Sequence, residues 1–95
     1  SRMGSIADNG SGGRYGYRMS KAALNAAGKS LAVDLEPKGV AVGIFHPGLV
    51  STDMIGGNGD ILPDVAATRI AGLIDKLTIS NSGTFWHSNG EILPW

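Results

Sequence analysis

The sequence predicts an α/β fold that forms one end of a doubly wound parallel sheet. Two segments have apolar residues at the three- and four-residue spacing of helices. Between them lies a short apolar, β-branched run, typical of a strand buried on both faces. The order is loop, helix, strand, loop, helix, strand, and such alternation indicates crossover helices between parallel strands. Because two strands cannot make a complete covered sheet, we expect the chain to belong to a larger domain.

The first half is expected to be a loop followed by a long helix. Residues 1–14 are rich in glycine, which tolerates the positive φ angles of turns. From Tyr15 to about Glu36, leucines and alanines recur with helical spacing. Pro37 and Gly39 then end the pattern, as residues that stop helices do.

The second half is expected to alternate between strands and one further helix. Residues 40–45 read as a strand, and a His-Pro-Gly sequence stops it. Residues 48–60 form a glycine-rich loop, and a proline at position 63 can begin a helix that ends near residue 79. Residues 84–87 read as the start of a second strand, and residues 91–93 as a last extended piece.

Composition excludes several classes of function. Eight basic and eight acidic residues cancel, and a neutral chain without a Lys/Arg run is a poor candidate for binding nucleic acid or an anionic membrane. The absence of cysteine excludes disulfides and iron–sulfur clusters. Residues 39–52, the longest uncharged apolar stretch, are too few to span a bilayer. No signal peptide opens the chain, so we expect a cytoplasmic protein; no methionine opens it either, so we expect a missing upstream segment.

Tyr17 and Lys21 are the first candidates for catalysis. They are four residues apart on the predicted helix, so their side chains lie on one face, one turn apart. An ammonium group close to a phenol favours the phenolate form. Such a pair can donate or accept a proton near neutral pH, although helical pairs at this spacing also occur as plain surface contacts.

Two further segments are expected to lie near Tyr17 and Lys21. One is a serine followed by a turn, and the other is the segment after the first strand. Ser1 precedes the turn glycine Gly4, and a serine hydroxyl beside a tyrosine hydroxyl can orient one carbonyl oxygen. Residues 46–54 follow a buried strand directly, at the edge of the sheet where doubly wound folds bind their ligands.

Together these residues resemble the motifs of the short-chain dehydrogenases/reductases. Tyr17 and Lys21 match the Tyr-x-x-x-Lys signature, Ser1-x-x-Gly4 resembles the active-site serine turn, and residues 47–52 resemble the loop that contacts nicotinamide. The longer segments around these motifs, residues 1–9 and 46–54, are similar to the C-factor branch of the family. The resemblance covers nearly the whole chain, and the three motifs occur in the family's order.

The resemblance implies an oxidoreductase that uses NAD or NADP on a small carbonyl or alcohol substrate. Tyr17 would be the proton donor or acceptor, Lys21 would support it and hold the nicotinamide ribose, and Ser1 would fix the substrate carbonyl. The implied cofactor contacts are Tyr17, Lys21, Pro47, Gly48, Val50 and Thr52.

The resemblance also places residues 1–95 in the C-terminal portion of one Rossmann domain. The family's glycine-rich dinucleotide fingerprint is absent from the sequence, so we expect the 95 residues alone to be inactive. In the full-length protein the resemblance implies a homo-oligomer, since the family's corresponding helix packs in a dimer interface; a helix face buried within the molecule is the open alternative.

Several alternatives stay open or are disfavoured. Ser5 is the rival of Ser1 for the catalytic role. A catalytically inactive fragment could instead act as a signalling or association module through the small residues of the first helix. Residues 23–30 match a loose phosphate-loop pattern, but their amides would be bonded within the helix. His46 and His87 lie far apart in the sequence, so no metal site is expected.

Overall fold

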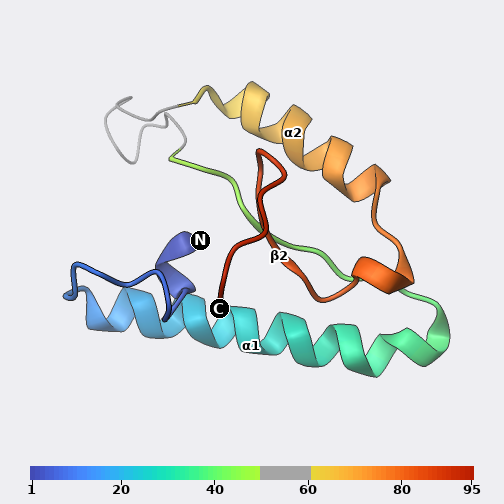
Figure 1. The fold of residues 1–95 in the computed structure, drawn as a ribbon, viewed down its shortest axis with the longest axis horizontal. Coiled ribbons are helices and arrows are strands. Elements are labelled where there is room, and N and C mark those ends of the chain that lie inside the picture. The colour runs from blue at the N-terminus through green and yellow to red at the C-terminus, as the bar shows by residue number, and fades with distance from the viewer. Residues whose placement is uncertain (50–60) are drawn as a thin grey trace.

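The computed structural model describes residues 1–49 and 61–95. A parallel pair of short strands lies between two helices, α1 along one side and α2 along the other (Figure 1). The helices and strands are α1 (Tyr15–Leu35), β1 (Ile44–His46), α2 (Pro63–Asp75) and β2 (Phe85–His87). Short 3₁₀ turns in the described part of the chain are η1 (Arg2–Gly4), η2 (Glu36–Lys38) and η4 (Ile79–Asn81). The predicted α/β class with a parallel sheet is thereby confirmed.

Helix α1 occupies the predicted range almost to the residue. It begins after Arg14, whose backbone is left-handed with φ 51°, and it ends where Glu36 and Pro37 tighten into η2. Gly39 then turns the chain back with φ 73°, a conformation that glycine adopts without steric cost. The sequence signals that end the helix therefore act where they were expected.

Strand β1 is shorter than predicted and lies further along the chain. The pairing with β2 begins at Ile44, not at residue 40, and runs through His46, which lies opposite His87. Before it, Val42 is bonded differently: its N–H donates to Ser82 Oγ at 2.8 Å, and its carbonyl accepts from Gly83 N. The side chain of Ser82 replaces a backbone partner there, so the regular ladder starts only two residues later.

Helix α2 ends at Asp75, four residues before the predicted end near residue 79. Thr78 is extended with φ −136°, and a reciprocal pair of bonds starts η4 instead. In this capping box Asn81 Oδ1 accepts from Thr78 N at 2.8 Å and the Thr78 side chain accepts from Asn81 N; outside the box, Asn81 Nδ2 donates to the Lys76 carbonyl at 3.1 Å. The helix does not continue here, because these hydrogen bonds satisfy polar groups on both sides of the break.

The expected opening loop is also more ordered than predicted. Residues 2–4 form η1, and Ser1 caps it because its Oγ accepts from Met3 N at 3.2 Å. The remaining residues up to Arg14 run as turns without a helix or strand, as predicted.

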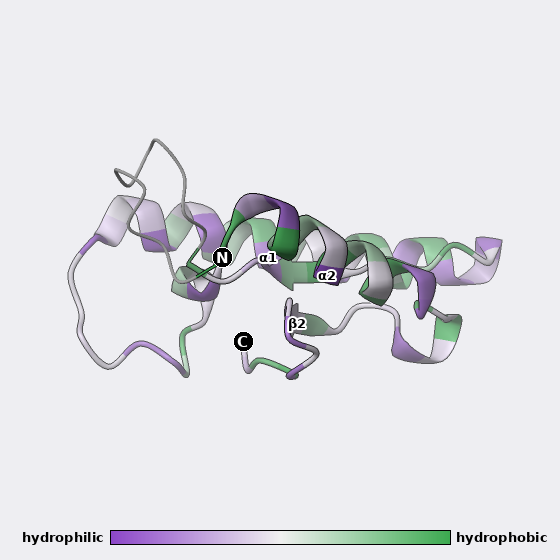
Figure 2. Cartoon of the chain, turned by 90° about the horizontal axis from the view of Figure 1, so that it is seen from above, coloured by the Kyte–Doolittle hydropathy of each residue, from purple (hydrophilic) through white to green (hydrophobic). Residues whose placement is uncertain are grey.

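The core lies around β2. Phe85 is 1% exposed and stacks on Trp95 with ring centroids 5.5 Å apart. Ala32 from α1 and Ala66 from α2 are buried. Both helices alternate between hydrophilic and hydrophobic residues along their length (Figure 2). Within the described residues, no helix combines the length and the hydropathy needed to cross a membrane.

Replacing Gly72 with alanine is expected to stabilise the protein. Gly72 lies inside α2, and a Cβ built there has no heavy atom within 4 Å. Alanine restricts the unfolded chain and favours helix, which contributes about 0.5–1 kcal/mol. Urea unfolding should therefore show a higher midpoint with an unchanged slope; a lower midpoint would contradict the open surroundings of this position.

Candidate active site

One cleft gathers the residues that the sequence analysis singled out. It has a volume of about 720 Å³ and lies between η1, the start of α1 and the chain that follows β1. Its lining residues are Ser1, Arg2, Met3, Asp8, Ser11, Arg14, Tyr17, Arg18, Lys21, His46, Pro47, Gly48 and Leu49. The predicted residues Val50 and Thr52 lie outside the described residues.

Helical spacing brings Tyr17 and Lys21 together as expected. The Lys21 Nζ atom lies 5.5 Å from the centroid of the Tyr17 ring, and the Arg14 guanidinium carbon lies 4.8 Å from it. Two cations at one aromatic ring are attracted by its π electrons and hold its orientation. Tyr17 remains 41% exposed, so a ligand can reach it from the cleft.

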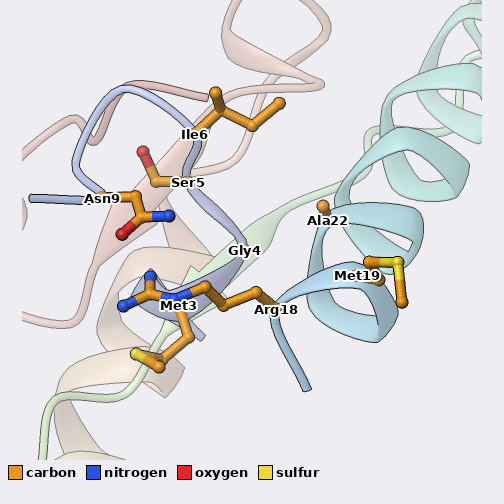
Figure 3. Close-up of a pocket in the computed structure, with 8 residues that line it drawn as sticks. All are labelled: Met3, Gly4, Ser5, Ile6, Asn9, Arg18, Met19 and Ala22. Atoms are coloured by element: carbon orange, nitrogen blue, oxygen red, sulfur yellow. The ribbon is translucent and has the colours of Figure 1, made fainter. Parts of the chain in front are cut away.

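The structure separates the two candidate serines. Ser1 lines the cleft with Tyr17 and Lys21. Ser5 is 2% exposed, and its Oγ accepts from Asp8 N at 3.1 Å, which fixes the turn after η1. Ser5 lines a separate pocket of about 230 Å³, where residues of η1 and the following loop face Arg18, Met19 and Ala22 of α1 (Figure 3). Of these two serines, Ser1 shares the cleft with Tyr17 and Ser5 does not.

Gly4 allows η1 to touch α1. A Cβ at Gly4 would lie 2.7 Å from both the carbonyl carbon and the carbonyl oxygen of Lys21, and 2.9 Å from Asn25 Nδ2. These distances are shorter than real Cβ contacts, and two of the three atoms belong to backbone. Close backbone approach, and not only the turn that the sequence indicated, requires glycine here. This contact sets the distance between the Ser1 turn and the Tyr17 face of the helix.

Pro47 and Gly48 form a fixed wall of the cleft. Gly48 has φ 96°, and a Cβ there would meet Ile61 Cδ1 at 3.3 Å and His87 Cε1 at 3.5 Å. Ser88, which is 3% exposed, donates from its Oγ to the Pro47 carbonyl at 2.7 Å. The left-handed backbone and this bond from the end of β2 hold the segment that the sequence analysis assigned to cofactor contact.

His46 also lines the cleft, in the segment expected at the ligand-binding edge of the sheet, but the sequence analysis assigned this side chain no role of its own. Its Nδ1 accepts from Arg2 N at 3.0 Å, and its ring lies edge to face with His87, with centroids 5.0 Å apart. Burial, followed by the nearby positive charges, lowers the pKa of His46 to about 4. Its position at the end of a buried strand, immediately before Pro47 and Gly48, was visible in the sequence, whereas its bond to Arg2 was not.

In the part of the chain that the structure describes, no group of three or more histidine or carboxylate side chains could hold a metal ion. The two histidines meet as a pair, although they are distant in the sequence. The arrangement therefore offers proton donors, acceptors and cations around an open cleft.

Comparison with known proteins agrees with this geometry. Residues 3–60 match the family model of the short chain dehydrogenases, which is more than half of the chain. The chain belongs to the short-chain dehydrogenase family. The resemblance noted in the sequence is thereby confirmed.

Curated relatives within this short-chain dehydrogenase family include two bacterial proteins. The 1-hydroxy-2-glutathionyl-2-methyl-3-butene dehydrogenase of Rhodococcus sp. (strain AD45) is 46% identical over 99 residues, covering 100% of this chain and 44% of that protein. The C-signal protein of Myxococcus xanthus is 48% identical over 96 residues, covering 100% of this chain and 57% of that protein. The chain thus spans about half the length of these relatives.

Solved structures of the family show the same fold. The carbonyl reductase Sniffer of D. melanogaster superposes with a TM-score of 0.93 at 43% identity, covering 100% of this chain and 38% of that one. The NADPH-bound carbonyl reductase from chicken fatty liver superposes with a TM-score of 0.89 at 31% identity, covering 100% of this chain and 40% of that one. The predicted relation to a Rossmann-like sheet is therefore confirmed for the described residues.

Proposed function

We propose that the protein containing this chain is an oxidoreductase that uses NAD or NADP on a small carbonyl or alcohol substrate. The observation that carries the proposal is one cleft in which Ser1, Tyr17, Lys21 and the Pro47–Gly48 wall meet. Two similar proteins support this proposal. The Rhodococcus protein is named a dehydrogenase, and the chicken carbonyl reductase was solved with NADPH bound.

The proposed roles follow from the chemistry of each side chain. The Tyr17 hydroxyl gives a proton to the substrate oxygen in reduction and takes it back in oxidation. Lys21 and Arg14 place positive charge beside the Tyr17 ring, and their attraction to its π electrons holds the ring at the cleft. The Ser1 hydroxyl donates to the same substrate oxygen and fixes its direction.

The residues present fit a nicotinamide cofactor. Gly48 leaves the wall of the cleft without a side chain, and the Lys21 ammonium can donate hydrogen bonds to ribose hydroxyls. When bound, the nicotinamide would supply or accept the hydride. We propose Tyr17, Lys21, Pro47 and Gly48 as contacts of this group; the other expected contacts, Val50 and Thr52, lie outside the described residues.

A second function, association without catalysis, has one observation in its favour. On α1, Ala23, Ala26 and Ala27 are exposed, and such small side chains let another helix approach closely. This surface could equally support a homo-oligomer of an active enzyme. Sedimentation and a reductase assay on one sample separate the two, since an active monomer argues against the association module.

Replacing Ser1 with alanine is expected to lower kcat in the full gene product. Loss of one preorganised hydrogen-bond donor at a developing oxyanion costs about 10²–10³ in kcat. The assay follows the absorbance of NADPH or NADH with a panel of aldehydes and ketones. Wild-type protein that oxidises neither cofactor with any member of the panel would overturn the proposed function.

Replacing Ser5 with alanine is the matched control. Because Ser5 is buried and bonded to the Asp8 amide, this change is expected to lower the free energy of unfolding and to leave kcat near the wild-type value. If Ser5→Ala loses turnover while Ser1→Ala keeps it, the assignment of the catalytic serine is reversed.

A further inference from the structure

We propose that His46 is a positioning residue of the active site: its Nδ1 atom holds the Ser1 turn in the cleft, and only the uncharged imidazole can do so. This inference rests on the proposed function for its effect on turnover. Its structural part, the bond between β1 and η1, can be tested without any activity.

The bond joins two segments that are distant in the sequence. Arg2 N donates to His46 Nδ1 at 3.0 Å, and the two residues are 44 positions apart. Arg2 is the first residue of η1, and the first amides of a helical turn have no acceptor within the turn. His46 supplies that acceptor, so it acts on Ser1 through the amide of the next residue.

The imidazole is itself held in place. His46 is the last residue of β1, and its carbonyl accepts from Ser88 N at 2.8 Å. The His87 ring, opposite it in the sheet, packs against it at an interplanar angle of 82°. His87 Nδ1 accepts from Asn89 N at 3.0 Å, which fixes that neighbour in turn. Strand pairing thus orients the imidazole ring that accepts the hydrogen bond from the Ser1 turn.

The bond requires one tautomer and one charge state. An Nδ1 atom that accepts carries no proton, so the ring proton lies on Nε2. The charged side chains facing His46 are His87 and Arg2, which oppose a further positive charge, and Asp8, which favours it. Asp8 is engaged by Arg2, with 2.8 Å between the carboxylate oxygen and Nε. Burial and these charges lower the pKa of His46 to about 4.

The sign of the pH dependence follows from that lowered pKa. Above pH 4 the folded protein holds His46 neutral and the bond to Arg2 stands; as the pH falls through about 4, Nδ1 gains a proton and turns from acceptor to donor. Between the ordinary histidine pKa of 6.5 and about 4, the unfolded chain binds the proton on residue 46 better than the folded protein does. The free energy of unfolding therefore decreases as the pH falls through this window. Neutral and alkaline solutions keep the Ser1 turn in place.

The test compares two substitutions in the full gene product. His46→Asn puts a carbonyl oxygen near the position of Nδ1 and cannot titrate, so we expect kcat within a few-fold of wild type and an acid limb of the kcat profile that no longer reflects residue 46. His46→Phe keeps a ring without an acceptor; because a small misplacement of a catalytic group can cost about 10²-fold, we expect kcat to fall by up to that factor with the KM for cofactor unchanged. Equal losses in both variants would overturn the proposal, as would full kcat in His46→Phe.

His87→Asn is the matched control on the neighbouring strand. It leaves the Arg2–His46 bond in place and removes one positive charge that faces His46, so the acid limb of the kcat profile is expected to move to higher pH. An unchanged or lower limb would contradict the charge arrangement described for His46.

Two readouts without turnover separate this inference from the proposed function. Long-range proton–nitrogen NMR correlations should show His46 protonated on Nε2 and not on Nδ1 at neutral pH. Hydrogen exchange of the Arg2 amide should accelerate in His46→Phe, while the Gly83 amide, bonded to the Val42 carbonyl, should exchange as in wild type. Unchanged Arg2 exchange overturns the positioning role even in an active enzyme; accelerated exchange in a protein without reductase activity supports it and overturns only the function.

Discussion

Replacing Tyr17 with phenylalanine is expected to abolish turnover in the full gene product while cofactor binding persists. The change removes one hydroxyl and keeps the ring, so the contacts of Lys21 and Arg14 with that ring remain. Loss of a positioned acid–base group lowers kcat by about 10²–10⁴-fold. Steady-state kinetics with a carbonyl substrate measures the loss, and fluorescence titration with NADPH and NADH measures binding.

Tyr15→Phe is the matched control for this change. Tyr15 begins the same helix two residues earlier, is 80% exposed and does not line the cleft. It should keep wild-type kcat. Turnover retained in Tyr17→Phe would rule out the phenol as the proton donor, whatever the relatives do.

Replacing Gly4 with alanine is expected to damage both stability and activity. The added methyl group would lie 2.7 Å from backbone atoms of Lys21, and backbone in the middle of α1 cannot move as a side-chain end can. Overpacking of this kind costs about 1–3 kcal/mol in the free energy of unfolding. Relief of the clash pushes η1 away from α1, which separates Ser1 from Tyr17. Urea unfolding and kcat measured at a temperature where the variant remains folded report the two effects.

Gly10→Ala supplies the comparison for Gly4→Ala. Gly10 lies in the same opening segment, and a Cβ built there has nothing within 4 Å. Its substitution should leave kcat unchanged. If Gly4→Ala is as stable and as active as Gly10→Ala, η1 does not rest on α1 as closely as the structure shows.

The sequence predicted the features that depend on local pattern. Helix α1 was located almost to the residue because its spacing and its terminating Pro37 and Gly39 agree. The parallel pairing of the strands followed from the alternation of elements. Tyr17 and Lys21 could be placed on one face because helical geometry alone decides that relation.

The features that were missed depend on side chains from distant segments. The start of β1 was misplaced because Ser82 Oγ bonds to the Val42 amide across 40 positions. The end of α2 was set too late because the Thr78–Asn81 capping box was not recognised. His46 was placed at the ligand-binding edge of the sheet and weighed as a metal ligand, but no local pattern shows that its partner is the Arg2 amide.

The bonds that close the cleft also determine when it can form as the chain folds. Arg2 meets His46 across 44 positions, and Ser88 meets Pro47 across 41. Contacts at such separation must overcome the entropy of closing a long loop, whereas the turns of α1 form from neighbours. Ser88 must therefore be synthesised before the Pro47 segment can be held in place, and Tyr17, on a helix made from local contacts, gains this side of its cleft only after that.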